Sequence, residues 1–391
     1  MRVLYLVPYA PTPIRTRPYN LIRGLTRRGH EVTLATLWES EEERAALGRL
    51  EREGVRVIAA RLTRGRAFWN LLRALPTGEP LQAHYCWNPS LARALGFEIR
   101  DSRFDVIHVE HLRGARYGLY IKSKMPETAG HAVRNPKPVL SPVEVSEIPV
   151  VWDAVDCISY LFEQAARDSR SLQGRLMTRL ELARTRRYEA WLVGQFDRVL
   201  VTSPTDKAAL EQLEAAYGSP SPGRRGGRGG EVSVLPNGVD LAYFCPDDTP
   251  RDPATVVFSG KMSYRNVEVT GTVPDIRPYL RRATLAVVPL VYGAGSQFKV
   301  LEAMACATPV VATPQASSAL QIQAGEQLLV AEDAETFAKS ILRLSNDPDL
   351  QHRLGAAGRH YVERQHDWKT IGQQLEFIYR NAIELKKGGN G

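Results

Sequence analysis

Cysteine is scarce in this sequence of 391 residues. The four cysteines, Cys86, Cys157, Cys245 and Cys306, lie far apart, without a Cys-x-x-Cys pair and without a His/Cys cluster at the spacing of metal ligands. A disulfide framework needs paired cysteines, and a structural zinc site needs clustered ligands. We therefore expect neither of them.

Long hydrophobic runs are also missing. No stretch approaches the roughly 18 uninterrupted apolar residues that a membrane-spanning helix needs. The first segment, residues 1–8, combines one charge, a short apolar run and an early proline, which indicates a buried strand rather than a signal peptide. These features predict a cytoplasmic protein that does not cross a bilayer.

Acidic residues are outnumbered, with 43 Asp and Glu against 51 Lys and Arg and a net charge of +8. This balance favours anionic partners such as nucleotide phosphates, acidic lipid headgroups or nucleic acid. No nucleic-acid-binding motif accompanies the charge, so we expect no nucleic-acid partner. A solvated helix face explains many of the basic residues, among them Arg179, Arg184, Arg186 and Arg187.

Apolar strands alternate with helical segments along most of the chain. In the first half we expect strands at 2–7, 31–37, 55–59, 106–109, 149–152 and 198–201, and helices at 17–28, 67–75, 160–192 and 207–215. Such alternation predicts an α/β fold with a parallel sheet covered on both faces.

A second α/β region begins at residues 255–259. In it we expect strands at 267–270, 285–289, 309–312 and 328–331 and a helix at 298–306. The domains predicted from this pattern are 1–235, with inserted loops at 122–147 and 218–230, then 236–346, and finally helices at 347–391 that pack back across both domains.

A glycine-rich turn between a strand and a helix is the strongest local sign of chemistry. Gly293, Gly295, Ser296 and Gln297 precede the helix, where exposed backbone N–H groups and the positive end of the helix dipole suit a phosphate. Glu302 lies about two turns into the helix and can accept hydrogen bonds from ribose hydroxyls. The alternative is a tight strand-to-helix turn without a ligand.

Several motifs occur in an order known from one large enzyme family. They occupy residues 28–32, 104–111, 196–203, 235–240, 258–261 and 293–313. Together they resemble the retaining glycosyltransferases of family 4, and most of all the bacterial sugar transferases found with surface-polysaccharide systems. The resemblance implies the GT-B fold, in which two Rossmann-like domains face each other across a cleft and the C-terminal one binds the nucleotide sugar.

The implied reaction moves a sugar from a nucleoside diphosphate sugar to a glycan or lipid-linked acceptor, with retention at the anomeric carbon and without a metal or another cofactor. Positive side chains then stabilise the charge that develops on the β-phosphate. By match to the family's motifs, Lys261 is the first candidate, Lys299 the second, and Asn237 belongs to the donor side. For either lysine, a simple surface position is the alternative.

Further candidates come from comparison with the same family. The family often carries His-x-His at the end of the fourth strand. In this chain Glu110 matches the later histidine by spacing, and His111 matches it by residue type. We favour His111, with a structural histidine as the alternative. The family's first loop has glycines, whereas this loop has none, and Arg15 and Arg17 offer charge to an anionic acceptor or simply face solvent. Glu302 matches the second glutamate of the family's EX7E motif, while Ala294 replaces the first.

The second domain is expected to be shortened. Only residues 260–266 separate two expected strands, too few for a parallel crossover, so that one helix and one strand of the family pattern are missing. We expect a smaller sheet, weak or absent turnover, and apolar surface that a partner or a second copy covers in a homo-oligomer. The alternatives to a transferase are a nucleotide-binding protein with little or no activity and a GT-B sugar-nucleotide epimerase.

The segment from Arg61 to Arg73 is basic and aromatic. One interpretation is that it rests on the anionic inner face of a membrane, as a basic amphipathic helix can. The other, which we favour, is that Phe68, Leu71 and Leu72 pack into the first domain.

Overall fold

The structure is a computed structural model that describes residues 1–101, 103–124, 148–168, 172–218, 230–259, 269–290 and 297–388. The chain divides into two units. Unit 1 comprises residues 1–235 and 372–391, and unit 2 comprises residues 236–371. The chain therefore enters unit 2 after Leu235 and returns to unit 1 after Ile371.

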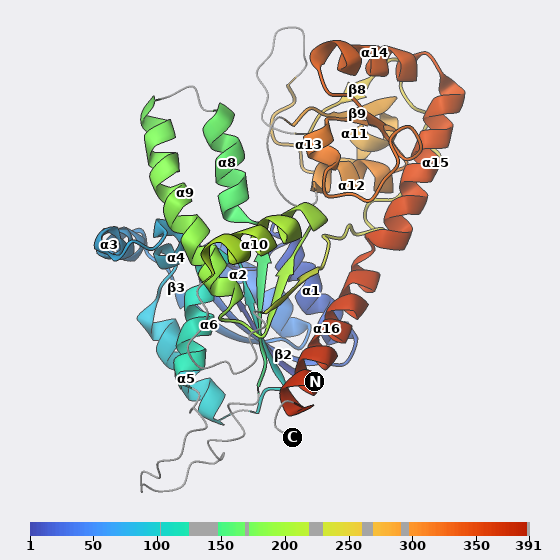
Figure 1. The fold of residues 1–391 in the computed structure, drawn as a ribbon. Helices are drawn as coiled ribbons and strands as arrows, with labels where there is room; N and C mark the ends of the chain where they lie inside the picture. The colour runs from blue at the N-terminus through green and yellow to red at the C-terminus, as the bar shows by residue number, and fades with distance from the viewer. Residues whose placement is uncertain are drawn as a thin grey trace, which may run out of the picture. The chain divides into compact units, whose positions relative to one another are not determined.

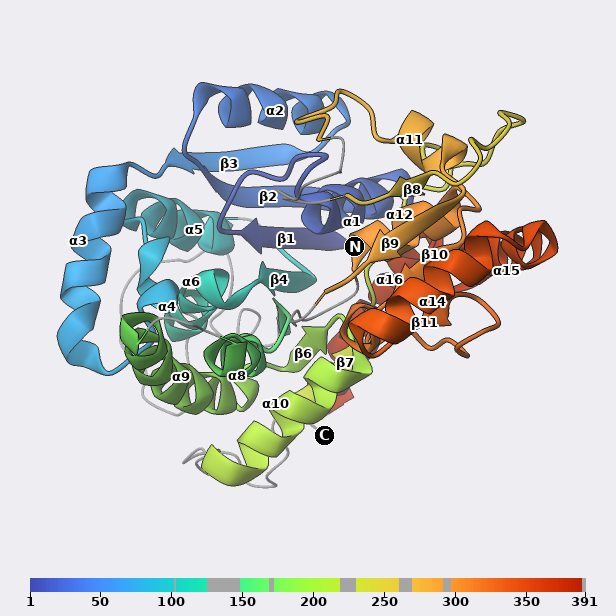
Figure 2. The same ribbon diagram turned by 90° about the horizontal axis from the view of Figure 1, so that it is seen from above.

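Unit 1 is built on a parallel seven-stranded sheet with the order β3-β2-β1-β4-β5-β6-β7. Figure 2 shows these strands following one another across the unit from β3 to β7. The central strands are buried on both faces, because helices cover each of them. The strands are β1 (Arg2–Val7), β2 (Glu31–Trp38), β3 (Arg56–Arg61), β4 (Val106–Glu110), β5 (Val150–Val155), β6 (Arg198–Val201) and β7 (Glu231–Val234).

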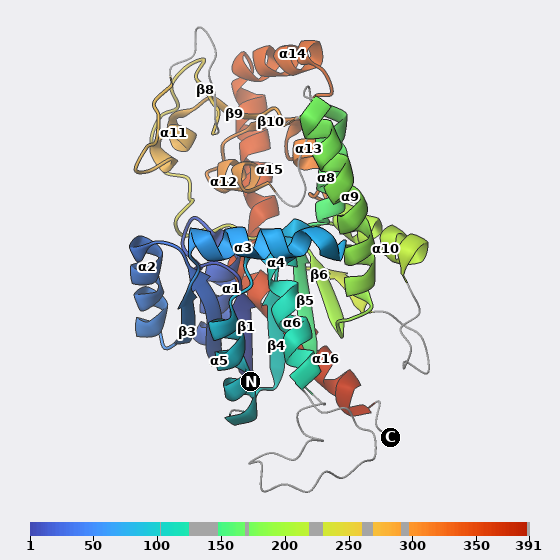
Figure 3. The ribbon, with the colours of Figure 1, turned by 90° about the vertical axis from the view of Figure 1, so that its left-hand side faces the viewer.

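Helices cover both faces of this sheet. In Figures 1 and 3, α5 and α6 lie on one face, and α1 and the last helix, α16, lie on the other. The unit contains α1 (Thr16–Arg27), α2 (Glu41–Arg52), α3 (Arg64–Ala74), the 3₁₀ turn η1 (Leu75–Thr77), α4 (Leu81–Tyr85), α5 (Pro89–Asp101), α6 (Leu112–Lys124), α8 (Ile158–Asp168), α9 (Leu172–Val193), α10 (Pro204–Tyr217) and most of α16 (Trp368–Gly388).

Local sequence signals set several helix starts. Ser203 caps α10 by accepting a hydrogen bond from the backbone N–H of Asp206, and Pro204 occupies the first helical position, as the Ser-Pro-Thr-Asp run predicts. Helices α2, α4, α5 and α6 were not expected from the sequence, and the long helix expected at 160–192 is described as two helices, α8 and α9.

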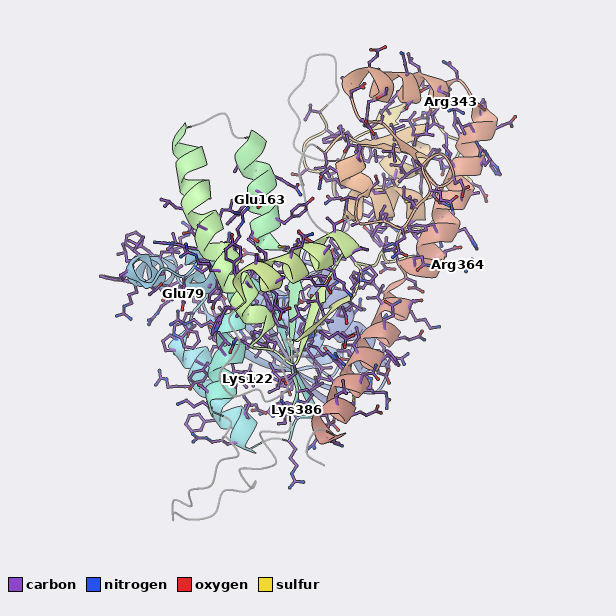
Figure 4. All side chains as sticks on the ribbon, in the orientation of Figure 1. Glu79, Lys122, Glu163, Arg343, Arg364 and Lys386 are labelled. Carbon is purple, nitrogen blue, oxygen red and sulfur yellow. The ribbon has the colours of Figure 1, made fainter. Side chains whose placement is uncertain are left out.

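The last helix completes unit 1. The hydroxyl of Tyr379 lies 2.9 Å from Nδ1 of His108 on β4, and both side chains are fully buried. Near the end of α16, the Nζ of Lys386 lies 2.7 Å from Oδ1 of Asp197 (Figure 4). The core of unit 1 thus includes residues from both ends of the described chain.

Unit 2 has a smaller parallel sheet, with the order β11-β10-β9-β8. Its strands are β8 (Val256–Val257), β9 (Leu285–Val288), β10 (Val310–Ala312) and β11 (Leu329–Val330), and its helices are α11 (Arg277–Arg282), α12 (Phe298–Ala305), α13 (Pro314–Ser317), α14 (Ala334–Ser345) and α15 (Pro348–Gln365). Strands β9 and β10 are almost fully buried, whereas Val256 on β8 is exposed.

Unit 2 agrees with the expected reduction in the part of the chain that the structure describes. Four strands are present there, and β8 pairs directly with β9. The strand expected at 267–270 is wrong at its last two residues, because Val269 is exposed and Thr270 belongs to no strand. Residues 260–268 lie outside the described ranges, so the loss of one helix and one strand there stays a prediction.

Two sequence expectations concern membranes. Among the described residues, no helix is long and apolar enough to span a bilayer. The favoured packing of Phe68, Leu71 and Leu72 into unit 1 is wrong for Phe68 and Leu72, whose side chains are exposed on α3, whereas Leu71 is half-buried.

Candidate functional site

His111 stands at the carboxyl end of β4 in an unusual backbone conformation. Its φ of 67° lies in the left-handed region, which is strained for a residue with a Cβ atom. Its N–H donates to the carbonyl of Asp153 on the neighbouring strand over 2.6 Å. Val155, near the end of β5, has a similar φ of 69°. Two adjacent strands therefore end in strained residues, a feature typical of functional sites.

The imidazole of His111 is prepared to donate a hydrogen bond. Burial, assisted by the nearby positive charge of Arg113, lowers the pKa of His111 to about 4, so the ring is neutral at pH 7. The backbone N–H of Arg113 lies 3.3 Å from Nδ1 of His111 and donates to it. Since Nδ1 accepts, the hydrogen of the neutral ring belongs on Nε2, which can donate to an oxygen of a ligand.

Glu110, the other candidate on β4, is fully buried inside unit 1. Tyr5 donates to its Oε2 over 2.6 Å, and Tyr9 donates to its Oε1 over 2.8 Å. Burial, together with the nearby charge of Asp153, raises the pKa of Glu110 to about 7. Both carboxylate oxygens are thus engaged by tyrosines, and one of these, Tyr9, belongs to the loop between β1 and α1.

A buried ion pair that sequence reasoning missed lies beside Glu110, and it overturns the expectation that Arg17 meets an acceptor or faces solvent. The guanidinium of Arg17 on α1 donates from Nη2 and Nε to Oδ2 of Asp153 over 2.7 and 2.9 Å, and from Nη1 to the carbonyl of Leu235 over 3.0 Å. Both side chains are buried. The sequence carried a signal for each partner. Asp153 directly follows the expected apolar strand 149–152, and Arg17 lies at the start of the first expected helix.

The cluster of His108, Glu110 and Asp153 does not fit a metal ion. His108, Glu110 and Asp153 offer ligand atoms within 4.8 Å of one another. However, the guanidinium of Arg17 already neutralises Asp153, and the two tyrosine hydroxyls occupy Glu110. His108 is fully buried, and burial near Arg17 lowers its pKa well below the usual value. The cluster is built around an arginine cation rather than a metal.

Arg15, the residue expected to meet an anionic acceptor, already has partners within unit 1. Its Nη2 lies 2.8 Å from Oε1 of Glu43 on α2, and its Nη1 donates to the carbonyl of Ala10. Its guanidinium also lies 5.0 Å from the ring centroid of Tyr9. An anionic ligand at Arg15 would therefore compete with the carboxylate of Glu43.

In unit 2 the candidate donor residues lie on and before α12. Glu302 is half-buried, and burial raises its pKa to about 7, although the charge of Lys299 opposes that shift. Lys299 lies one turn earlier, with its Nζ 5.5 Å from the ring centroid of Phe258. The two side chains are therefore on one face of the helix, where one can accept hydroxyl hydrogens and the other can meet a phosphate.

Gln297 is the N-cap residue of α12, and its carbonyl accepts from the N–H of Val300 over 3.0 Å. The other predicted members of this turn, Gly293, Gly295 and Ser296, lie outside the described residues, and so does Lys261. Their roles stay predictions.

Asn237 lies at the start of unit 2 and is buried. Its carbonyl oxygen is 2.7 Å from Nδ1 of His366, and a Cβ atom on the adjacent Gly238 would come within 2.6 Å of the indole of Trp368. These contacts give the Asn-Gly turn a packing role within unit 2.

The two family models that match this chain follow each other along the sequence. Residues 14–220 match the glycosyl transferase 4-like domain, and residues 249–347 match the glycosyl transferases group 1. The first match alone covers more than half of the chain. The chain belongs to this glycosyltransferase family. The resemblance found from the motifs is thereby confirmed.

Curated relatives of this glycosyltransferase match over shorter segments. It is 37% identical over 115 residues to the alpha-maltose-1-phosphate synthase of Mycolicibacterium smegmatis, which is 27% of this chain and 30% of that protein. It is 28% identical over 127 residues to a GDP-mannose-dependent phosphatidylinositol monomannoside mannosyltransferase of Corynebacterium glutamicum, which is 32% of each chain. The alignments thus span about a third of either relative.

Solved structures match over nearly the whole length. Sucrose-phosphate synthase from Thermosynechococcus elongatus gives a TM-score of 0.64 at 16% identity, covering 98% of this chain and 99% of that one. Anabaena HepE in complex with UDP-glucose gives a TM-score of 0.61 at 14% identity, covering 97% and 100%. At these identities the likeness shows the fold, which is the expected GT-B fold with two α/β units.

Proposed function

We propose that this glycosyltransferase moves a sugar from a nucleoside diphosphate sugar to a glycan or lipid-linked acceptor with retention at the anomeric carbon. Family membership supports the reaction class. The donor assignment depends on one observation. Glu302 and Lys299 lie close together on one face of α12, the helix that follows β9 along the chain. A relative named as GDP-mannose-dependent and a neighbour solved with UDP-glucose support a nucleotide-linked donor.

Glu302 and Lys299 carry opposite charges and bind different parts of the donor. Above pH 7 the carboxylate of Glu302 is ionised and accepts hydrogen bonds from the ribose hydroxyls. The ammonium of Lys299 and the backbone N–H groups at the start of α12 face the diphosphate, whose negative charge grows as the bond to the sugar breaks. A preorganised cation lowers the barrier at that step because it requires no reorganisation of solvent.

His111 acts on the sugar rather than on the diphosphate in this proposal. Its neutral ring donates from Nε2 to a sugar hydroxyl, and its strained backbone fixes where that donor points. Glu110 holds Tyr9 in the loop before α1 and is a positioning residue. Arg15 releases Glu43 and binds an anionic group of the acceptor in its place.

A panel of UDP, GDP, ADP and dTDP sugars, screened by thermal unfolding, tests the donor assignment first. A ligand that binds only the native state raises the unfolding temperature, so we expect one base to stabilise the protein more than the others. The stabilising donor is then incubated with lipid-linked and glycan acceptors, and the product is examined by NMR for its anomeric configuration. Inversion, isomerisation of the donor without transfer, or stabilisation by no nucleotide would each contradict the proposal.

A further inference from the structure

Helix α3 presents its large apolar side chains to solvent. Phe68 and Trp69 are 59% and 61% exposed, and Leu72 and Leu75 on α3 and η1 are 40% and 52% exposed. The side of α3 that is buried carries Ala67, Asn70 and Ala74 instead. An ordinary surface helix has the opposite arrangement, with large apolar residues toward the core.

Polar contacts add to the packing of the buried Ala67 and Ala74 in holding α3 in this orientation. The amide Nδ2 of Asn70 donates to the backbone carbonyls of Tyr85 and Trp87 over 3.0 and 2.8 Å. Figure 3 shows α3 as the outermost helix on its side of unit 1, in front of α4. The face of α3 with small side chains therefore packs against unit 1, and the face with large apolar side chains is exposed to solvent.

The charged residues within residues 61–78 have one sign. Arg61, Arg64, Arg66 and Arg73 are exposed there, and residues 61–78 contain no Asp or Glu. The next acidic residue, Glu79, lies 2.6 Å from Nε2 of His84 (Figure 4). We name the four exposed apolar residues and these four arginines the α3 patch.

The α3 patch continues onto α9. The Nη2 of Arg184 donates to the carbonyl of Leu75 over 3.2 Å, which joins the two elements. Leu180, Arg187 and Trp191 are exposed on α9, and their spacing places them on one face of the helix with Arg184. The surface therefore combines aromatic, aliphatic and arginine side chains from two helices.

We propose that the α3 patch docks this protein on the surface of an anionic lipid bilayer. Aromatic rings interleaved with arginines suit the headgroup level, where the rings enter the apolar boundary and the guanidinium groups meet lipid phosphates. A second copy of the chain fits less well, because a symmetric contact would bring the four arginines of one patch against the same arginines of the other. The inference goes beyond the proposed transferase function and does not depend on it.

Sedimentation of the full chain with vesicles tests the docking. We expect binding to vesicles that contain phosphatidylglycerol, a fall in binding as salt is added, and little binding to phosphatidylcholine alone. The double variant Phe68→Ala/Trp69→Ala should lose binding to the anionic vesicles. The matched control Phe97→Ala/Phe377→Ala removes two aromatic rings that are equally exposed elsewhere, at 65% and 64%, and should bind like the unchanged chain.

Charge is tested separately. Each arginine near an anionic surface contributes about fivefold to binding, so Arg64→Gln/Arg66→Gln should weaken it by about 25-fold. The control Arg343→Gln/Arg353→Gln neutralises two exposed arginines of unit 2 (Arg343 is labelled in Figure 4) and should leave the affinity unchanged. Unfolding temperatures of all the variants should match, because the substituted side chains are exposed.

A fluorescence measurement locates the contact. Vesicles with brominated acyl chains should quench tryptophan emission of the unchanged chain, and Trp69→Phe should bind equally well but lose a large part of that quenching, with the remainder coming from Trp191 on α9. Equal binding to neutral and anionic vesicles, or full binding by Phe68→Ala/Trp69→Ala, would overturn the proposal. So would self-association without lipid that this double variant abolishes, because a second copy would then cover the patch.

Discussion

The pair of Arg17 and Asp153 is the most heavily buried charge contact of the site. Its guanidinium and carboxylate are 4% and 0% exposed, and Glu110 lies in the same cluster. Attraction between two buried charges is offset by the cost of removing both from water. Its main consequence is that neither partner can be removed alone without leaving an uncompensated charge.

We predict that Arg17→Met lowers the free energy of unfolding by about 3–5 kcal/mol, because Asp153 is left as a buried unpaired carboxylate. The control Lys339→Met breaks the exposed pair with Glu335 on α14 and should cost less than about 1 kcal/mol. Urea denaturation of both variants measures the difference. Similar losses for the two would show that burial does not control the strength of the Arg17 contact.

In the proposed donor site, Glu302 should make nucleotide binding depend on pH. Its pKa of about 7 means that the carboxyl group is mostly protonated at pH 6 and mostly ionised at pH 8. An ionised carboxylate accepts hydroxyl hydrogen bonds more strongly than a neutral acid. Affinity for the nucleotide should therefore rise as the pH increases from 6 to 8.

We predict that Glu302→Gln weakens nucleotide binding by roughly tenfold at pH 8, since a hydrogen bond to a charged group is lost, and that it removes the rise in affinity with pH. Titration calorimetry at pH 6 and pH 8 measures both effects. Glu335→Gln, which changes an exposed carboxylate of the same unit, is the control and should behave like the unchanged protein. A rise with pH that survives in Glu302→Gln would assign it to another group.

At the scale of elements, glycine marks where helices approach neighbouring backbone. A Cβ atom on Gly355 in α15 would lie 2.3 Å from the carbonyl oxygen of Ala307, in the turn between α12 and β10. A Cβ atom on Gly24 in α1 would meet no atom within 4 Å. The same residue type therefore has a packing role in one helix and none in the other.

Gly355→Ala should destabilise the protein by about 1–3 kcal/mol, because α15 must move away from the turn. Gly24→Ala should stabilise it by about 0.5–1 kcal/mol, because alanine loses less backbone entropy in a helix. Thermal or urea unfolding compares the two changes, which are chemically identical. Effects of the same sign would contradict the close contact of α15 with Ala307.

Sequence patterns predicted the elements of the parallel sheets well, because central strands are apolar runs that need no knowledge of their partners. They failed for α3, where hydrophobicity predicts that the large apolar side chains face inward, whereas the buried side carries alanines and Asn70, which donates to the carbonyls of Tyr85 and Trp87. They also missed the ion pair of the site, since Arg17 and Asp153 are 136 positions apart and no local period links them. The positive φ of His111 likewise follows from the tertiary contact of its N–H with β5.

At the scale of the molecule, the two units differ in the size of their sheets, with seven strands in unit 1 and four in the described part of unit 2. A smaller unit buries a smaller fraction of its surface on folding and is less stable. The family membership and the overall GT-B fold could be predicted from motif order, because those motifs occupy strand ends and turns in both units. The assignment of residues 372–391 to unit 1 depends on long-range contacts such as that of Tyr379 with His108.

We predict that unit 2 unfolds before unit 1. In hydrogen exchange with increasing urea, peptides from 297–312 should lose protection at a lower urea concentration than peptides from 106–118. Peptides from 375–385 should follow unit 1, because Leu375 and Tyr379 are fully buried in it. One shared midpoint for all three segments, or loss of 375–385 together with 297–312, would contradict this order.

The return of the chain to unit 1 also has a consequence for biosynthesis. A ribosome makes residues 236–371 after most of unit 1 and before α16 beyond Gly372, so unit 2 can form its own core while unit 1 still lacks a helix. Until that helix arrives, Nδ1 of His108 has no Tyr379 hydroxyl, and the face of the sheet that α16 covers remains open to water or to a chaperone. The residues of unit 2 are therefore all synthesised before the last residues of unit 1.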